Sequence, residues 1–166
     1  MRKLVKIVGS TIIAVVALLL LLSFTGFEPK GCPPTDRSLA CRMPGLWIKG
    51  EPVTTPIADW SFTDTIPEIK IQTQTPYLVP HSVTIWCATY KGNLYVTSYR
   101  GRQWVEDIIR DPRVRLKIAD RVFDRTLSVV DDPAEKAAVL QAKGKKYPQW
   151  KVPAVSTATV FRLNPA

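Results

Sequence analysis

The sequence has few of the residues that build metal centres and disulfide-rich folds. Its 166 residues include one histidine and three cysteines, with no C-x-x-C or H-x-x-x-H spacing. A structural zinc site needs four nitrogen or sulfur ligands at paired spacings, which argues against a zinc enzyme. The signatures G-x-G-x-x-G, Walker A and G-x-S-x-G are also missing. We predict no metal site, we identify no catalytic side chain, and we expect any chemistry to come from a bound organic cofactor.

The charge balance favours bases without forming a basic block. Lysine and arginine number 23 against 14 aspartates and glutamates, which gives a formal net charge of +9. The bases are interleaved with acids, so nucleic-acid binding is not predicted. With 46% hydrophobic residues the chain is too apolar for a disordered tail. Beyond residue 27 the net charge is +6, and 139 residues remain, which suits a single domain.

The N-terminal segment, residues 1–27, has the composition of a membrane-spanning helix. Arg2, Lys3 and Lys6 precede residues 7–27, which contain no ionisable side chain. About 20 apolar residues cross a bilayer as a helix, so this run is long enough to serve as a signal anchor. A cleaved signal peptide is the alternative, although small residues are poorly placed for cleavage. A lipoprotein site at Cys32 lies too far beyond the apolar run.

The flanking charges predict the topology of this anchor. Three basic side chains and the terminal amine crowd the first six residues, whereas Lys30, Arg37 and Arg42 are spread out and diluted by Glu28 and Asp36. The positive-inside rule then keeps the N-terminus in the cytoplasm and exports the remainder. The expected location is a bacterial-type inner membrane, with a single pass and a periplasmic domain.

Residues 28–67 are predicted to form a proline-rich stalk and lead-in. Here Cys32 and Cys41 lie close enough in sequence for a disulfide, which would persist in an oxidising compartment. Two unpaired thiols in a linker are the alternative. Residues 45–50 suggest a short strand that ends at a glycine, and we expect Trp47 and Trp60 to pack on the main domain. Cys87 lies in an apolar strand pattern and is expected to be buried and inert.

Residues 68–166 alternate polar and apolar positions in the manner of short strands. A Gly-containing turn at 91–93 joins two of them as a hairpin, and Asp131-Asp132-Pro133 supplies a helix cap followed by proline. Strands are predicted at 68–73, 81–90, 94–98, 114–118, 122–130 and 158–163, and helices at 103–110 and 134–143, the second ended by Gly144. A mainly β chain with short helices predicts a small antiparallel barrel, because closure covers the sheet edges.

Four segments carry a resemblance to a known superfamily. Residues 80–86 (PHSVTIW), 92–98 (GNLYVTS), 100–104 (RGRQW) and 108–114 (IIRDPRV) occur in an order that resembles the flavin-binding split barrels, and residues 161–165 are similar to their terminal strand. That superfamily includes pyridoxamine-phosphate-oxidase-like and deazaflavin-dependent nitroreductase-like proteins. The resemblance covers about residues 68–165. It implies a split antiparallel β-barrel, a homodimer with two cofactor sites at the subunit interface, and a flavin-type cofactor.

The resemblance and the residue chemistry together predict a binding site. Hydroxyls and guanidinium groups before a helix N-terminus suit a phosphate, although a solvated basic loop is the alternative. The second strand runs along the cofactor in the superfamily, and an aromatic residue marks its deazaflavin-using branch. The predicted cofactor-binding residues are His81, Ser82, Thr84, Thr97, Ser98, Arg100, Arg102, Gln103 and Trp104. FMN is the expected cofactor, with a deazaflavin or none as alternatives.

Two functional hypotheses follow. The first is a membrane-anchored oxidoreductase of the pyridoxamine-phosphate-oxidase-like class, which acts on a small molecule or a membrane quinone. The second is a non-catalytic split barrel that binds a ligand or a partner in the envelope. A Ser/His/Asp hydrolase built on His81 with Ser82 or Ser98 is disfavoured, because neither serine lies on a strand-turn-helix elbow.

Overall fold

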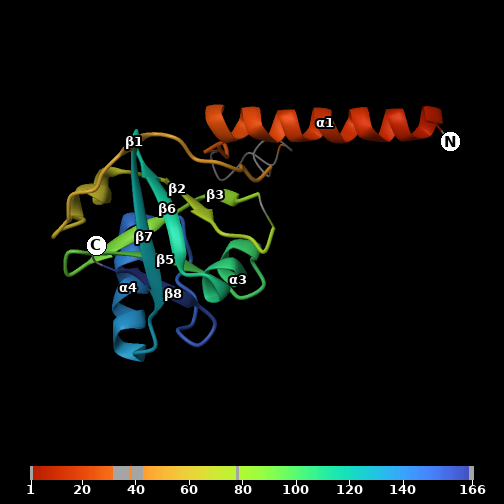
Figure 1. The fold of residues 1–166 in the computed structure, drawn as a ribbon. Coiled ribbons are helices and arrows are strands. Elements are labelled where there is room, and N and C mark those ends of the chain that lie inside the picture. The colour runs from red at the N-terminus through yellow and green to blue at the C-terminus, as the bar shows by residue number, and fades with distance from the viewer. Residues whose placement is uncertain (1, 32–37, 39–42, 78, 165–166) are drawn as a thin grey trace.

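The computed structural model describes residues 2–31, 38, 43–77 and 79–164, and it shows a curled sheet from which one helix projects (Figure 1). That helix, α1 (Arg2–Thr25), exposes its apolar side chains. Within it, the 20-residue segment Lys6–Thr25 contains an 18-residue window with a mean hydropathy of 2.7, none of which is buried, so the segment is long and apolar enough to cross a membrane. A signal sequence near the N-terminus would satisfy the same criterion.

The sheet contains eight strands in the spatial order β3-β2-β6-β7-β8-β5-β4, with β1 added to β7. All neighbours pair antiparallel except β1 and β7. The strands are β1 (Glu51–Pro52), β2 (Ile69–Thr73), β3 (His81–Ile85), β4 (Cys87–Tyr90), β5 (Asn93–Ser98), β6 (Arg113–Ile118), β7 (Arg121–Val129) and β8 (Thr159–Leu163). This architecture confirms the predicted split antiparallel barrel.

The single strand predicted over residues 81–90 is wrong, because the strand is interrupted at Trp86 and continues as a second strand from Cys87. β3 and β4 stand at opposite ends of the sheet order, and only Trp86 separates them along the chain. The sheet has therefore curled until its two edges lie one residue apart, and the chain itself bridges them in place of a ladder of hydrogen bonds. The run of apolar and β-branched residues continues across the break through Ile85, Trp86 and Cys87, so composition alone could not reveal it.

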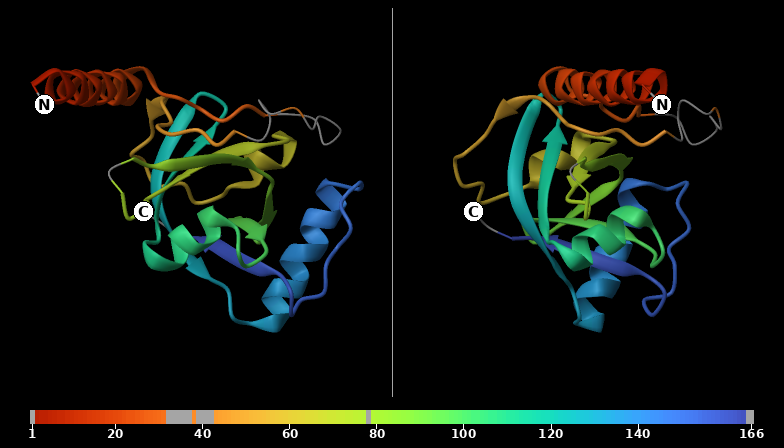
Figure 2. Two further views of the ribbon diagram at one scale, coloured as in Figure 1. Left: turned by 90° about the vertical axis from the view of Figure 1, so that its right-hand side faces the viewer. Right: turned by 45° about the vertical axis from the view of Figure 1, so that its right-hand side comes forward.

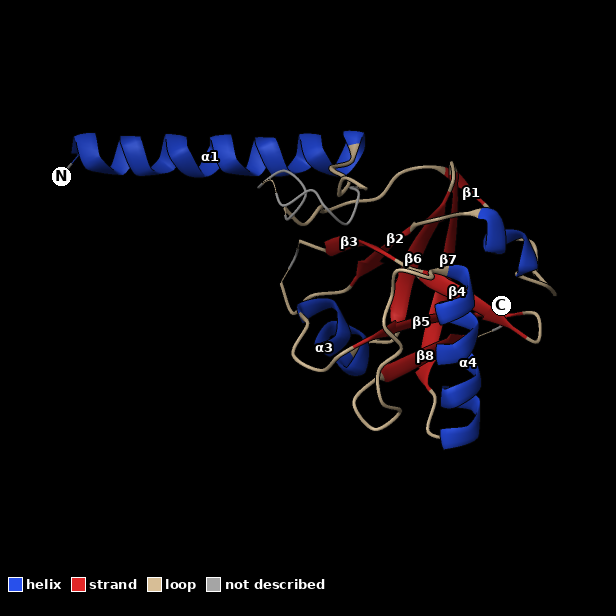
Figure 3. Ribbon diagram, turned by 180° about the vertical axis from the view of Figure 1, so that it is seen from behind, coloured by secondary structure: helices blue, strands red, loops and turns tan. Residues whose placement is uncertain are grey.

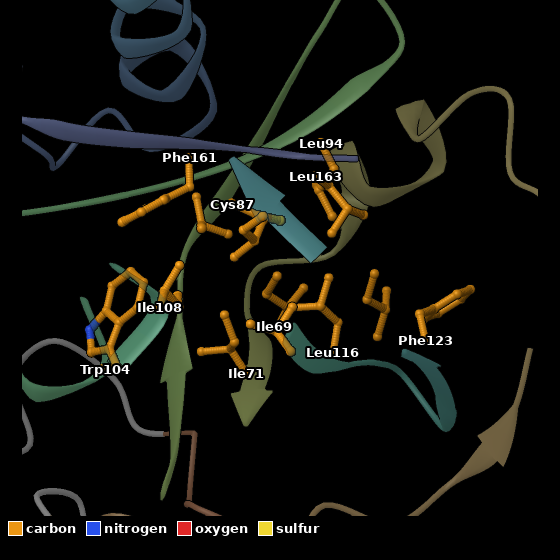
Figure 4. Close-up of a cluster of buried hydrophobic side chains, with 14 of the residues drawn as sticks. Ile69, Ile71, Cys87, Leu94, Trp104, Ile108, Leu116, Phe123, Phe161 and Leu163 are labelled. Atoms are coloured by element: carbon orange, nitrogen blue, oxygen red, sulfur yellow. The ribbon is translucent and has the colours of Figure 1, made fainter. Parts of the chain in front are cut away.

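The core fills the inside of the curled sheet. Every second residue of β6, from Val114 to Ile118, is buried, while Arg113, Arg115 and Lys117 face outward, as the two-residue period of a strand requires. Figure 4 shows Ile69, Ile71, Cys87, Leu94, Leu116, Phe123, Phe161 and Leu163 converging in this core, with Trp104 and Ile108 at one side. Cys87 is free and buried, as predicted, and burial raises the pKa of its thiol.

Two further helices cover the barrel. α3 (Gln103–Arg110) has the predicted bounds and packs against β2 and β3, while α4 (Pro133–Lys146) lies across β4, as Figure 3 shows from behind. Asp132 caps α4 as predicted, accepting hydrogen bonds from the backbone N–H groups of Ala134 at 3.0 Å and Glu135 at 3.2 Å.

The predicted end of α4 at Gly144 is wrong, because the helix continues to Lys146. A Cβ atom at position 144 would lie only 2.7 Å from Cγ2 of Val152. The glycine therefore allows the returning chain to approach the helix closely, and it does not end the helix.

The lead-in before the barrel contacts it at several points. The strand predicted over residues 45–50 is wrong: in this segment only Gly45 forms a β-bridge, with Ser82. Trp60 is buried in the core and meets Phe123 edge-on, with ring centroids 5.2 Å apart, as its predicted packing required. Cys32 and Cys41 lie outside the described residues, so their disulfide stays a prediction, as do the domain boundaries at residues 27 and 67.

Candidate functional site

A hollow of about 390 Å³ opens beside the break at Trp86. Its wall comes from β3, the end of β5, the start of α3, α4 and the segment between α4 and β8. Five predicted residues line it, namely Thr84, Thr97, Ser98, Arg102 and Trp104. The volume falls in the range of about 300–1,000 Å³ that is typical of small-molecule sites.

Three residues that sequence reasoning missed, Trp86, Lys143 and Trp150, give this hollow its chemistry. Trp86 is held by Tyr147, whose ring stacks on it at 4.6 Å with planes 7° apart. The amine of Lys143 lies 4.5 Å from the ring centroid of Trp150 and 5.9 Å from that of Trp86. Ring faces attract cations at such distances.

Lys143 is a buried cation with little compensation. Its residue is 5% exposed, and Nζ donates a hydrogen bond to Oγ1 of Thr97 at 2.6 Å. Among the described residues no carboxylate lies within ion-pairing distance of this amine. Burial, with a smaller contribution from Lys146, lowers the pKa of Lys143 to about 8. The amine therefore suits an anionic or strongly hydrogen-bond-accepting group placed in the hollow.

The position of Lys143 on α4 follows from helical spacing. Val139, Leu140 and Lys143 are the buried residues of α4, and residues three and four apart share one face of a helix. A lysine on the apolar face of a helix was thus the signal available in the sequence. This signal was hard to recognise, because Lys145 and Lys146 also lie at the end of α4 and make Lys143 resemble an ordinary surface lysine.

The other predicted site residues lie elsewhere. His81, Ser82, Arg100 and Gln103 do not line the hollow. Ser82 is fully buried beneath the bridge to Gly45, and its hydroxyl has no described hydrogen-bond partner. Arg100 is exposed in the loop after β5. Of those in the hollow, Thr84 directs its hydroxyl to the carbonyl of Lys30 at 3.3 Å. All nine residues remain predictions as cofactor ligands.

Gln103 and His81 belong instead to a polar cluster around Asp107. This fully buried carboxylate accepts hydrogen bonds from Thr73 Oγ1, Gln103 Nε2 and Arg110 Nη2, each at 3.0 Å. Nδ1 of His81 lies 3.6 Å away, which is too long for a hydrogen bond. The cluster joins α3 to β2, so its arrangement is that of a structural tie.

A second hollow, of about 570 Å³, lies against the outward-facing residues of β2, β6 and β7. Arg113, Arg115 and Arg125 line it, and the first two are ion-paired. Arg113 pairs with Asp111 at 2.6 Å and Arg115 with Asp124 at 2.7 Å, while Arg125 donates to two backbone carbonyls. The hollow at Lys143 is smaller, yet it has the uncompensated cation and the aromatic walls, so it is the better ligand site.

The described residues contain no group of three or more His, Cys, Asp or Glu side chains that could hold a metal. The lining of the hollow at Lys143 also includes no Asp, Glu or His within the described parts of the chain. Lys143 is therefore the titratable amine of the described lining, and redox chemistry in this hollow would depend on a bound cofactor.

Comparison with family models and with curated proteins finds no match to the chain. Solved structures do match. A Listeria innocua protein provisionally named a pyridoxamine 5'-phosphate oxidase has 14% identity over 63% of this chain and 88% of its own, with a TM-score of 0.52. An F420 reductase has 20% identity, coverage of 68% and 96%, and a TM-score of 0.52.

A third structure, a provisionally named 5-nitroimidazole antibiotic resistance protein of Bacteroides thetaiotaomicron, has 16% identity over 72% of this chain and 87% of its own, with a TM-score of 0.52. Similarity at this level concerns the fold, and these proteins share the architecture that the sequence resemblance predicted. The chain therefore has the split-barrel fold of the pyridoxamine-phosphate-oxidase-like and deazaflavin-reductase-like proteins.

Proposed function

We propose that this protein is a membrane-anchored oxidoreductase whose split barrel binds a flavin-type cofactor in the hollow at Lys143. The observation that carries the proposal is the buried amine of Lys143, which has aromatic faces on two sides and no carboxylate partner among the described residues. The names of the similar structures, an F420 reductase and a pyridoxamine 5'-phosphate oxidase, support a cofactor of this class.

The residues of the hollow fit such a cofactor. Trp86 and Trp150 would supply apolar surface beside a planar ring, and the amine of Lys143 would supply positive charge. The guanidinium of Arg102, at the start of α3, suits a phosphate, and the hydroxyls of Thr97 and Ser98 add hydrogen-bonding groups. When bound, a flavin-type cofactor supplies hydride or electron transfer, while the protein supplies orientation and charge.

Lys143 is expected to have a second task besides binding. With a pKa of about 8, the amine is mostly protonated at neutral pH, so it can donate hydrogen bonds and stabilise negative charge. The hollow shields that charge from water, which strengthens its effect. The reacting small molecule, or a membrane quinone, would enter beside the cofactor.

Binding of FMN to the full-length protein in detergent, followed by fluorescence quenching, tests the proposal. We expect Lys143→Met to weaken binding by roughly 10- to 150-fold, which corresponds to about 1.5–3 kcal/mol for a hydrogen bond to a charged group. Lys145→Met is the matched control, because Lys145 is exposed and lies on the same helix. Equal affinities in all three proteins would contradict the proposal, and the same series with a deazaflavin distinguishes the two cofactors.

The non-catalytic alternative shares the same hollow and differs in turnover. A protein that binds the cofactor but does not exchange electrons with any added donor, while the cofactor stays bound, would be a binding module. The described lining of the hollow includes no Asp, Glu or His, which is the observation that supports this alternative.

Topology and assembly complete the proposal. α1 anchors the barrel with its N-terminus in the cytoplasm, so a periplasm-dependent reporter fused after Ala166 should be active. Activity of a cytoplasm-dependent reporter alone would contradict this orientation. The homodimer is tested by the mass of the protein in detergent micelles, and a monomeric mass would remove the two-site arrangement that the resemblance implies.

A further inference from the structure

The junction between α1 and the barrel is short and closely bonded. Glu28 follows the last residue of α1 by three positions, a distance of at most about 11 Å along the chain. The carboxylate of Glu28 accepts hydrogen bonds from Nζ of Lys70 at 2.6 Å, Nζ of Lys117 at 2.8 Å and the backbone N–H of Lys49 at 3.0 Å. Lys70 and Lys117 belong to the adjacent strands β2 and β6, so the chain is tied to the sheet directly after the helix.

Backbone hydrogen bonds reinforce this tie. The N–H of Phe27 donates to the carbonyl of Trp47 at 3.0 Å, and the N–H of Leu46 donates to the carbonyl of Phe27 at 2.6 Å. Trp47 is half-buried here, close to the end of α1, although 22 residues of sequence separate it from Thr25. The barrel is thus not suspended on a free linker, and its orientation relative to α1 is set by these bonds.

The bonded junction has a consequence for a chain anchored by α1. Lys6–Thr25 rises about 30 Å as a helix, which equals the hydrocarbon thickness of a bilayer. The headgroup layer adds only about 5–7 Å on each side. Because the barrel is bonded to the chain within about 11 Å of the helix end, one of its faces must lie at the headgroup layer.

The figures identify that face. α1 projects past the side of the barrel that carries α3 and the loop between β2 and β3, and the view onto this side in Figure 2 places α3 in front (Figures 1 and 2). η1 (Ser61–Thr65) lies on the far side (Figure 1). A hydrogen bond from Trp60 N to Gly92 O places the turn between β4 and β5 beside η1.

The segments on the side toward α1 carry exposed aromatic, aliphatic and basic residues. Tyr77, in the loop between β2 and β3, is 79% exposed, while Ile109, 42% exposed, and Arg110, which pairs with Asp107, end α3. Tyr99, 45% exposed, and the exposed Arg100 lie in the loop that leads into α3. Tyrosine is enriched at the membrane–water interface, and arginine near an anionic bilayer gains electrostatic attraction.

We propose that the face formed by Tyr77, Tyr99, Ile109, Arg100 and Arg110 docks on the headgroup layer of an anionic bilayer. This inference rests on the proposed anchor. The hollow at Lys143 shares Tyr99 in its wall, so docking would bring the edge of that hollow to the lipid surface.

Photo-crosslinking of the full-length protein in lipid nanodiscs tests the docking. Benzoylphenylalanine is placed at position 99 or 77 in one set of variants, and at position 62 as the control. Phe62 is a suitable control because it is 46% exposed, like Tyr99 at 45%, but lies on η1 at the far side. We expect lipid adducts by mass spectrometry at positions 99 and 77 and few or none at 62, with higher yield in phosphatidylglycerol discs than in phosphatidylcholine discs.

The contribution of charge to docking is tested with Arg100→Gln, and the readout is the yield of lipid adducts from benzoylphenylalanine at position 77. Lys91→Gln, in the turn beside η1, is the control. Removal of Arg100 should shift the docking equilibrium in anionic discs by roughly fivefold, and removal of Lys91 should not. If alkaline carbonate releases the protein from membranes, the anchor itself is wrong. If the protein stays anchored but adducts form equally at positions 99 and 62, the docking face alone is overturned.

Discussion

The barrel buries two charged groups, Asp107 and Lys143, in opposite ways. Asp107 accepts hydrogen bonds from three side chains, one of them the guanidinium of Arg110, so its charge is compensated on all sides. Among the described residues, Lys143 donates a hydrogen bond to the hydroxyl of Thr97 and otherwise faces tryptophan rings and a hollow. Removal of one partner from a compensated buried charge is destabilising, whereas a buried charge without a counter-charge itself opposes folding and is typical of a ligand site.

The largest effect should come from removing the compensated charge. Asp107→Ala leaves the buried hydroxyl of Thr73 without its acceptor and unties α3 from β2, so the free energy of unfolding should fall by about 1–3 kcal/mol for the unsatisfied donor, with a further loss for the cavity. Chemical denaturation followed by tryptophan fluorescence measures this. Glu106→Ala, at the exposed neighbouring position, should lower the free energy of unfolding far less. A similar loss of stability in both variants would show that Asp107 is not a special link between α3 and β2.

Removing Lys143 should have the opposite sign. Its pKa lies near 8 in the folded protein and at its ordinary value of 10.5 when unfolded, so burial of the protonated amine opposes folding by roughly 3 kcal/mol below pH 8. Lys143→Met should therefore raise the free energy of unfolding at pH 7. A loss of stability comparable to that of Asp107→Ala would show that Lys143 is also a structural tie.

The same pKa predicts how this difference depends on pH. Between pH 8 and 10.5 the unfolded chain holds the proton and the folded protein releases it, so the contribution of Lys143 to stability rises with pH in this window. The advantage of Lys143→Met should shrink over the window. Only the difference in stability between the wild type and Lys143→Met is informative, because the raised pKa values of Cys87 and Tyr95 make both proteins less stable as the pH rises. A stability difference between the two proteins that does not change with pH would contradict the lowered pKa of Lys143.

A smaller effect should separate Arg102 from Arg100. Arg102 lines the hollow and Arg100 does not, so Arg102→Ala should weaken FMN binding by about 1.5–3 kcal/mol and Arg100→Ala by much less. Both arginines are exposed, so each substitution should change the free energy of unfolding by no more than about 0.5 kcal/mol, as judged by thermal melts. Equal losses of FMN affinity in the two variants would mean that the loop moves when the ligand binds. Unchanged affinity in both variants would mean that Arg102 does not contact the cofactor.

Most strands and α3 could be predicted because local periodicity and turn residues determine them. The hairpin at Gly92, the helix ending before Pro112 and the cap at Asp132 each carry their own chemical signal. Trp86 and Gly144 were missed because a tertiary constraint decides both. The curl of the sheet breaks the strand at Trp86, and the approach of Val152 requires glycine at position 144.

The candidate site was predictable only in part for the same reason. Thr97 and Ser98, at the end of β5, lie in the hollow together with Arg102, but no periodicity in the loop could show that Arg102 lines it and Arg100 does not. Lys143 comes from a helix that is 46 residues beyond Thr97 in the sequence, so only the folded chain brings the two together. His81 seemed a ligand because it is the single imidazole, and its surroundings are those of the Asp107 tie.

The absorption spectrum of the full-length protein as purified, with mass analysis of any compound released on denaturation, tests whether a cofactor occupies the hollow at Lys143. We expect the bands of a flavin or deazaflavin in the wild type, retained in Lys145→Met and lost or strongly reduced in Lys143→Met. A colourless wild-type protein that binds neither FMN nor a deazaflavin when they are added would contradict a cofactor site at Lys143.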